Sequence, residues 1–162
     1  MEKKLRTAKI GSEIRSLART YALVALRNLD GNRKAELLQF LSESKLITEN
    51  PIISLLGADL TNSDLNNASL IKAEIKGAQF VNSNFKDANL FQSNLCGCDF
   101  SNSIFDGAIL EGADLSYAIL KSAKLRNLDL TKTNLEWANL EKADLSNTKI
   151  TKEQLKNLES TF

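Results

Sequence analysis

The side chains that could support catalysis in this chain are carboxylates, hydroxyls and two thiols, because the sequence contains no histidine. Histidine is the commonest general base and the commonest side-chain metal ligand, so a serine nucleophile would lack its usual activating partner. The 20 Asp and Glu residues fall mainly at positions that the pattern described below turns toward solvent. These residue types predict that the chain is not an enzyme and has no catalytic, cofactor-binding or metal-binding residues.

The two thiols belong to Cys96 and Cys98, on either side of Gly97. A structural zinc site needs about four ligands, and the chain has no further cysteine and no histidine to supply them. The positions predict a packed Cys98 and a surface thiol at Cys96, for which a redox role stays open. Gly57, Gly77 and Gly97 recur at a spacing of 20, which predicts turns rather than a phosphate-binding loop.

A five-residue period runs from Leu55 to Ile150, where every fifth residue is Leu, Ile or Phe. From Leu60 onward the residue two positions earlier is nearly always small, with Leu128 as the large exception, and the residue between is most often Asp or Asn. This period fits neither the 3.6-residue turn of a helix nor the simple alternation of a strand. It predicts units that each bury one small and one large side chain and then turn, for which Asn, Asp, Ser and Gly are suited.

A longer period of 20 residues is visible in the less common residue types. Phe80 and Phe85 recur as Phe100 and Phe105, which predicts that four units form one coil. Neighbouring coils would then lie about 4.8 Å apart, close enough for stacked opposite charges to pair weakly. The charges at this spacing are Lys86 with Asp106 and Arg126, Lys121 with Glu141, and Lys124 with Asp144.

The five-residue pattern closely resembles the pentapeptide-repeat family, whose consensus is Ala, then Asp or Asn, then Leu and two variable residues. The resemblance implies a mainly β fold, a right-handed quadrilateral parallel β-helix of about five coils of 20 residues, which would form a rod roughly 24 Å long. The closest matches to the consensus are Gly57-Ala58-Asp59-Leu60, Gly112-Ala113-Asp114-Leu115, Ala88-Asn89-Leu90, Ala138-Asn139-Leu140 and Ala143-Asp144-Leu145.

Helices are predicted at both ends of the rod, where unpaired edges would otherwise be exposed. A first helix is predicted over residues 3–29, and a turn at Asp30-Gly31 leads to a second helix with Asn32 as its N-cap. The capping-box pattern from Thr151 to Gln154 predicts a short helix over residues 152–160. The apolar residues that define the first helix are Ile10, Ile14, Leu17, Tyr21 and Val24.

Three domains follow from these elements: residues 1–50 as a two-helix N-terminal cap, 51–150 as the β-helix and 151–162 as a C-terminal capping helix. The stretch from Leu26 to Leu41 is similar to the segment before the repeats in many cyanobacterial pentapeptide-repeat proteins, which implies a cyanobacterial type. In several of those proteins a transmembrane helix precedes this segment. No apolar run long enough to span a bilayer, and no signal peptide, occurs here, so a cytoplasmic location is expected.

Large apolar residues at outward positions are the candidate interaction surface. Ile71 and Phe91 share one column of the 20-residue frame, and Tyr117 and Trp137 share another, with Ile119 nearby. One interpretation is that they pack beneath the terminal helices or lie singly on the surface, as exposed apolar residues commonly do. The other is that paired aromatics on the side of a solenoid form a docking site for a protein partner.

The charge distribution weighs on the choice of partner. The net charge is +1 overall, and residues 51–162 carry 11 basic and 14 acidic residues, so nucleic acid is not favoured. We expect a non-enzymatic protein-interaction module with no small-molecule substrate. Some members of the family mimic DNA and bind topoisomerases, but basic residues interrupt any acidic stripe here. A third hypothesis is peripheral membrane association through the basic N-terminal helix, which carries Lys3, Lys4, Arg6, Lys9, Arg15, Arg19 and Arg27.

Overall fold

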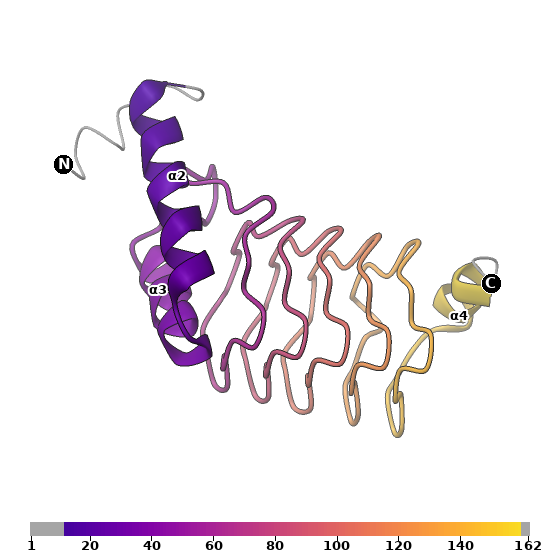
Figure 1. Ribbon diagram of the computed structural model, residues 1–162. Coiled ribbons are helices and arrows are strands. Elements are labelled where there is room, and N and C mark those ends of the chain that lie inside the picture. Colours follow the sequence, from indigo (N-terminus) through magenta and orange to yellow (C-terminus); the bar gives the residue numbers. More distant parts are fainter. Residues whose placement is uncertain (1–11, 160–162) are drawn as a thin grey trace.

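The computed structural model describes residues 12–159, which form helices at the two ends of a coiled solenoid (Figure 1). Helix α2 (Glu13–Asn28) and helix α3 (Gly31–Glu43) lie at the N-terminal end, and helix α4 (Lys152–Glu159) lies at the other. Helix α2 corresponds to the predicted first helix, whose residues 3–11 lie outside the described part. Within residues 12–159, no helix combines the length and apolar character that a membrane span requires.

Successive coils of the solenoid pair with one another at the predicted spacing of 20 residues. Parallel bridges join Asp64 to Asn84 and Asn84 to Ile104, and the same relation recurs at every fifth residue from 59 to 149, except between Ile109 and Asp129. Each pairing uses two hydrogen bonds of opposite direction: Leu65 N donates to Asn84 O at 2.7 Å, and Asn84 N donates to Ser63 O at 2.9 Å. The 20-residue period is therefore confirmed by the backbone itself.

The pairing occurs as isolated bridges, and no continuous strand forms within residues 12–159. The reason is a turn in nearly every unit, where one residue takes a left-handed conformation; Asn62, Asn82 and Asn102 have φ of 58° to 60°. This conformation costs a residue with a Cβ about 1–2 kcal/mol, least for Asn, which explains the Asn-rich turns. The expectation of a mainly β fold holds for the hydrogen bonding but not for strand length, because the turns leave only short extended stretches.

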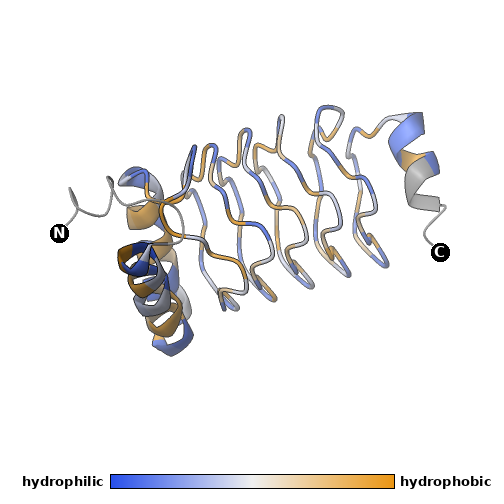
Figure 2. Cartoon of the chain, turned by 90° about the horizontal axis from the view of Figure 1, so that it is seen from above, coloured by the Kyte–Doolittle hydropathy of each residue, from blue (hydrophilic) through white to orange (hydrophobic). Residues whose placement is uncertain are grey.

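The core of the solenoid is a column of the large residues of the five-residue period. Phe80 stacks on Phe100 with ring centroids 5.3 Å apart, and Phe85 stacks on Phe105 at 4.8 Å. The small inward residues include Ser83. Its buried hydroxyl donates to Leu60 O at 3.0 Å, so this hydroxyl has the hydrogen-bond partner that a buried polar group needs. Figure 2 shows the resulting alternation of hydrophobic and hydrophilic residues along each coil.

Backbone carbonyls of the N-terminal segment take the place of a preceding coil. Asp64 N donates to Gly31 O at 3.4 Å, and Glu74 N donates to Ile47 O at 2.6 Å. Helix α3 approaches so closely that a Cβ on Gly31 would lie 1.9 Å from Asn62 O. Glycine is therefore required at this position by the packing of α3 on the first coil.

Cationic side chains complete the same edge by donating to its carbonyl groups. Arg19 Nη2 donates to Leu56 O at 2.7 Å, and Lys34 Nζ donates to Thr61 O at 3.3 Å and to Asp59 Oδ1 at 3.1 Å. Lys34 is only 5% exposed, so its ammonium group is held by these acceptors rather than by water. Two basic residues of the N-terminal segment thus serve the structure of the rod.

The N-cap of α3 is Asp30 and not Asn32 as the sequence indicated. The Asp30 carboxylate accepts from Arg33 N at 3.0 Å. Because this carboxylate caps the first turn, the helix begins at Gly31, two positions earlier than expected, and Asn32 lies inside its first turn. At the other end the predicted capping box is confirmed: Gln154 N donates to Thr151 Oγ1 at 3.1 Å, and Thr151 N donates to Gln154 Oε1 at 2.8 Å.

Candidate interaction surfaces

The aromatic pair of Tyr117 and Trp137 lies on the side of the solenoid. The rings stack with centroids 6.5 Å apart and an interplanar angle of 13°. Both residues occupy left-handed turn positions, with φ of 58° and 61°, which project their side chains outward. They are 61% and 51% exposed, and Trp137 Nε1 donates to Glu136 Oε1 at 3.1 Å. The predicted column is therefore a pair of stacked aromatic rings open to solvent.

The other three residues of the predicted surface are less exposed to solvent. Ile119 is 38% exposed and Ile71 39% exposed, while Phe91 is only partly exposed. The column of Ile71 and Phe91 belongs to a different five-residue unit of the coil from that of Tyr117 and Trp137. The five residues therefore form two separate groups, of which Tyr117, Ile119 and Trp137 make the aromatic one.

Ion pairs between neighbouring coils cover much of the remaining side surface. Lys121 Nζ lies 2.9 Å from Glu141 Oε2, and the hydrogen bond from Lys121 lowers the pKa of the Glu141 carboxyl. Lys132 Nζ lies 2.7 Å from Glu111 Oε1, and the hydrogen bond to Glu111 raises the pKa of the Lys132 ammonium group. Since each cation sits beside an anion one coil away, these sides carry alternating rather than uniform charge.

Arg126 is the cation with the most acidic neighbours among these ion pairs. Only some of the charge pairs predicted at the 20-residue spacing are formed. The guanidinium group of Arg126 contacts the Asp106 carboxylate and lies 3.8 Å from Asp144 Oδ2. The hydrogen bond to Asp106 raises the pKa of Arg126. The predicted pairing of Lys124 with Asp144 is a longer-range interaction, because the Asp144 carboxyl accepts primarily from Ser146.

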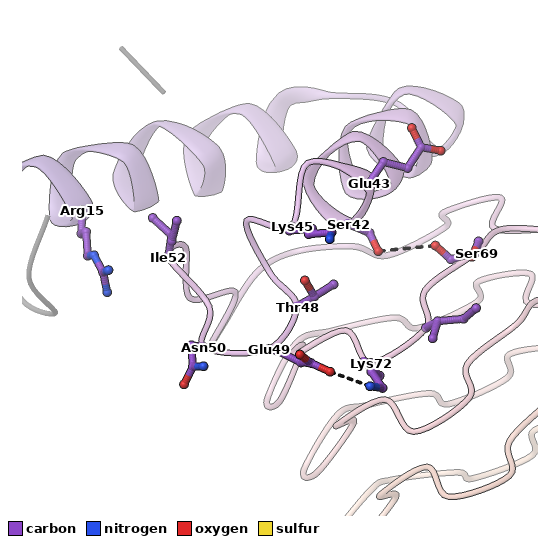
Figure 3. Close-up of a pocket in the computed structure, with 11 residues that line it drawn as sticks. Arg15, Ser42, Glu43, Lys45, Thr48, Glu49, Asn50, Ile52, Ser69 and Lys72 are labelled. Carbon is purple, nitrogen blue, oxygen red and sulfur yellow. Dashed lines mark hydrogen bonds and ion pairs between the residues drawn. The ribbon is translucent and has the colours of Figure 1, made fainter. Parts of the chain in front are cut away.

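A hollow of about 690 Å³ lies between α2, the C-terminal end of α3 with the segment that follows it, and the first coil (Figure 3). Arg15 enters it from α2, and its Nε is buried with no hydrogen-bond partner within residues 12–159. At the opposite wall Lys72 Nζ lies 2.6 Å from Glu49 Oε1; the hydrogen bond from Lys72 lowers the pKa of the Glu49 carboxyl. Ser42 Oγ donates to Ser69 O at 3.4 Å, so that hydroxyl is engaged in the fold.

The two thiols differ as the sequence predicted. Cys98 is buried, its Sγ donates to Ile75 O at 3.1 Å, and burial raises the pKa of the thiol to about 12. A thiol with so high a pKa is protonated and unreactive at neutral pH. Cys96 is partly exposed. Across the described residues, no three His, Cys, Asp or Glu side chains are grouped closely enough to hold a metal ion.

The sequence pattern did not identify a further apolar surface, which lies on α2. The residues Ile14, Leu17, Tyr21 and Val24 indicated a helix through their spacing, but all four face solvent. The side of α2 that packs inward carries Ala22 and Leu26. Spacing reveals that a helix has an apolar stripe, but it does not reveal whether this stripe faces the rest of the same chain.

A solenoid of stacked 20-residue coils, with small and large side chains alternating inside, defines a repeat protein whose sides are available as surfaces. The sequence model described as "Pentapeptide repeats (8 copies)" matches residues 54–87, 83–121 and 118–152. The chain belongs to the pentapeptide repeat family. Proteins of this family fold as right-handed quadrilateral β-helices, and they are generally structural or interaction modules rather than enzymes.

Several solved structures are similar to parts of the chain. A pentapeptide repeat protein from the thylakoid lumen of Arabidopsis thaliana is 27% identical, with a TM-score of 0.43; the match covers 56% of this chain and 59% of that one. HetL, a pentapeptide repeat protein involved in heterocyst differentiation regulation from the cyanobacterium Nostoc sp. strain PCC 7120, is 25% identical, with 59% and 52% covered and a TM-score of 0.26.

A plasmid-mediated fluoroquinolone resistance protein, QnrB1, is 16% identical, with 65% of this chain and 90% of that chain covered and a TM-score of 0.24. No curated protein matches the chain. The chain thus spans little more than half the length of the thylakoid-lumen and heterocyst-regulation proteins that it resembles.

Proposed function

We propose that the chain is a non-enzymatic interaction module that binds a protein partner through the aromatic face of Tyr117, Ile119 and Trp137. The observation that carries this proposal is the stacked, solvent-exposed pair of Tyr117 and Trp137. Tyr and Trp are enriched among the residues that contribute most to protein–protein binding, because they bury a large area and lose little conformational freedom. The regular core beneath them keeps the two rings in a fixed position before a partner arrives.

The proposed module is a rod of about five coils. Its helical cap lies within residues 1–50, its β-helix within 51–150 and its C-terminal helix within 151–162. Ile71 and Phe91, one unit away around the coil, would form a secondary contact. We place the module in the cytoplasm, as the sequence favours. The partner is expected to present an apolar surface that can receive the aromatic pair.

The experiment uses Trp137, because it is the single tryptophan of the chain and its fluorescence reports directly on this face. The intact protein is immobilised, candidate partners are captured from a cell extract and identified by mass spectrometry, and each is titrated against the protein while the Trp137 emission is followed. A partner of the aromatic face is expected to shift the emission to shorter wavelength and to bind at least about tenfold more weakly to Tyr117→Ala.

Ile109→Ala provides the matched control, because Ile109 is 49% exposed but belongs to a different unit. It is expected to bind every partner as the unchanged protein does. Binding that survives the double substitution of Tyr117 and Trp137 by Ala would count against the proposed face.

Binding of a topoisomerase by DNA mimicry is the weaker alternative. A mimic of DNA needs a continuous row of uncompensated carboxylates, whereas Glu141, Glu111 and Asp106 each face a cation from a neighbouring coil. Inhibition of DNA supercoiling by the intact protein at low micromolar concentration would reverse this ranking.

A further inference from the structure

Helix α2 exposes an apolar stripe that nothing within residues 12–159 covers. Ile14, Leu17, Tyr21 and Val24 are 46%, 52%, 65% and 52% exposed. They lie along one side of the helix, and the opposite side packs Ala22 and Leu26 toward the rod. In Figure 1 the N-terminal half of α2 projects past the first coil. A contiguous row of large exposed apolar side chains is typical of an interaction site.

The spacing within the stripe indicates what kind of partner fits. The steps from Ile14 to Leu17, Tyr21 and Val24 are three, four and three residues, which is the a/d repeat of a helix that packs against one other helix. This seam is narrow, because its flanks carry Glu13, Thr20 and Arg27 on one side and Ala18 and Ala25 on the other. A membrane-binding helix presents a broader apolar face with cations along its rim.

The cations of α2 do not fit a membrane-facing role. Arg19 turns toward the rod and donates to Leu56 O, and Arg15 enters the hollow beneath the helix. Only Arg27 remains beside the stripe, with Glu13 on the same flank near the other end of the helix. A second helix is therefore a better match to this surface than an anionic lipid layer.

The charges on the flank specify the direction of the second helix. Glu13 and Arg27 are both exposed, and neither belongs to an ion pair within residues 12–159. They occupy equivalent flanking positions 14 residues apart. In an antiparallel pair of identical helices, Glu13 of each copy faces Arg27 of the other, while the small residues Ala18 and Ala25 allow close approach. A parallel pair would place Glu13 beside Ala18 and form neither ion pair.

We propose that α2 is a homodimerisation element, which packs antiparallel against α2 of a second copy of this chain. The seam is formed by Ile14, Leu17, Tyr21 and Val24 of both copies, and two symmetric ion pairs join Glu13 to Arg27. The twofold axis passes near Thr20, which meets Thr20 of the other copy. Such an interface is self-complementary, as the commonest dimers are. It is independent of the aromatic face, because Tyr117 and Trp137 lie on the side of the rod.

Sedimentation velocity of the full chain over a wide concentration range tests the proposal. The unchanged protein is expected to dimerise reversibly, and Leu17→Glu is expected to remain monomeric at concentrations about 100-fold above the dissociation constant of the unchanged protein, since it places a charge in the seam. Because Leu17 is exposed in the monomer, the Leu17→Glu variant should have the same circular dichroism spectrum as the unchanged protein. Phe40→Glu is the matched control, because Phe40 is a similarly exposed apolar residue of α3, and it should dimerise normally.

A charge exchange tests the direction of the helices. Glu13→Arg and Arg27→Glu are each expected to raise the dissociation constant about 5- to 10-fold, since each places like charges at two sites, and the double variant should restore most of the loss. In a Cys96→Ser background, Thr20→Cys should form a disulfide-linked dimer under mild oxidation, whereas Glu13→Cys should not, because only residue 20 meets its own counterpart near the axis.

A chain that stays monomeric at all concentrations would overturn the proposal, as would a dimer that Leu17→Glu does not disrupt. Efficient disulfide cross-linking of Glu13→Cys would overturn the antiparallel arrangement. So would a double charge-exchange variant that dimerises as weakly as the single variants. Co-sedimentation of a monomeric chain with anionic phosphatidylserine vesicles, abolished by Leu17→Glu, would assign the stripe to a membrane surface instead.

Discussion

The two ends of the solenoid are closed in different ways. At the N-terminal end, carbonyls of Gly31 and Ile47 and the cations of Arg19 and Lys34 occupy hydrogen-bonding positions that a further coil would fill. At the C-terminal end, the side-chain amide of Gln154 donates to Leu130 O and to Thr133 O, each at 2.8 Å. The equivalent carbonyls Ala73 O, Ser93 O and Ala113 O each accept from a backbone amide of the next coil, so Gln154 replaces one such group.

The apolar core is also covered more completely at the N-terminal end than at the C-terminal end. Leu26 and Leu38 of the N-terminal helices are fully buried, whereas Leu145 and Ile150 of the last coil are only partly buried and Leu155 of α4 is 41% exposed. Closing a solenoid therefore has two separable parts, the pairing of edge hydrogen bonds and the covering of the core. The N-terminal segment performs both, and α4 performs mainly the first at one corner.

The largest difference between the ends is expected from truncating one leucine in each. Leu38→Ala removes a fully buried side chain of α3 and should lower the free energy of unfolding by about 2–5 kcal/mol. Leu155→Ala removes a side chain of α4 that is already 41% exposed and should cost less than about 0.5 kcal/mol. Urea denaturation followed by circular dichroism measures both. Equal losses would show that α4 covers the core as fully as α3 does.

An intermediate effect is expected from removing the polar group that each end uses. Lys34→Met retains the apolar stem but leaves Asp59 and Thr61 O without the ammonium group, which should cost about 1–3 kcal/mol because Lys34 is buried. Gln154→Ala should cost about 1 kcal/mol, since its groups are partly exposed.

Hydrogen–deuterium exchange locates these two losses. Lys34→Met should accelerate amide exchange around residues 59–64, and Gln154→Ala should accelerate it around residues 131–134. Lys86→Met, at an exposed turn, is the control and should change neither region. Faster exchange at both ends from one substitution would mean that the rod opens as a unit rather than from its ends.

The smallest effect is a dependence of the N-terminal end on pH. Burial would raise the pKa of the Asp59 carboxyl, but hydrogen bonds from Thr61 and from Lys34 outweigh it and lower the pKa below its ordinary value of 3.8. A carboxyl whose pKa is lower in the folded than in the unfolded state stabilises the fold at any pH above its unfolded-state pKa. This stabilisation is lost as the pH falls through the folded-state pKa. Acidification below about pH 4 should therefore loosen this end.

Asp59→Asn isolates this contribution, because other carboxyls with lowered pKa values, such as Asp129 and Glu141, weaken the rod in the same pH range. Thermal melting between pH 6 and pH 3 should show the unchanged protein more stable than Asp59→Asn at pH 6, with the difference shrinking as the pH falls. A difference that stays constant with pH would exclude ionisation of Asp59 as its source.

The repeat was predictable from sequence because each of its residues has a local reason. A five-residue period of large apolar side chains has few structural solutions, and the recurrence of Phe80 and Phe85 as Phe100 and Phe105 revealed the coil length. The stacking of Tyr117 on Trp137 followed from the same frame. Within a solenoid, neighbours in space are fixed by a constant offset in sequence, so contacts can be read directly.

The ends were less predictable, because their contacts follow no constant offset. Nothing in the spacing of Arg19 or Lys34 shows that these cations cap carbonyls of the first coil. The steric demand for glycine at position 31, the first residue of α3, arises from Asn62, 31 residues away. For the same reason the solvent-facing direction of the α2 stripe required the packed structure.

The constant offset between coils has a consequence for the length of the molecule. Each end segment contacts the solenoid through a few residues of the terminal coils, and the interior coils meet only one another. Duplicating a stretch of 20 residues from the interior would therefore insert one more coil and move the two ends apart by about 4.8 Å. The number of interior coils therefore sets the separation of the two end segments, in steps of about 4.8 Å.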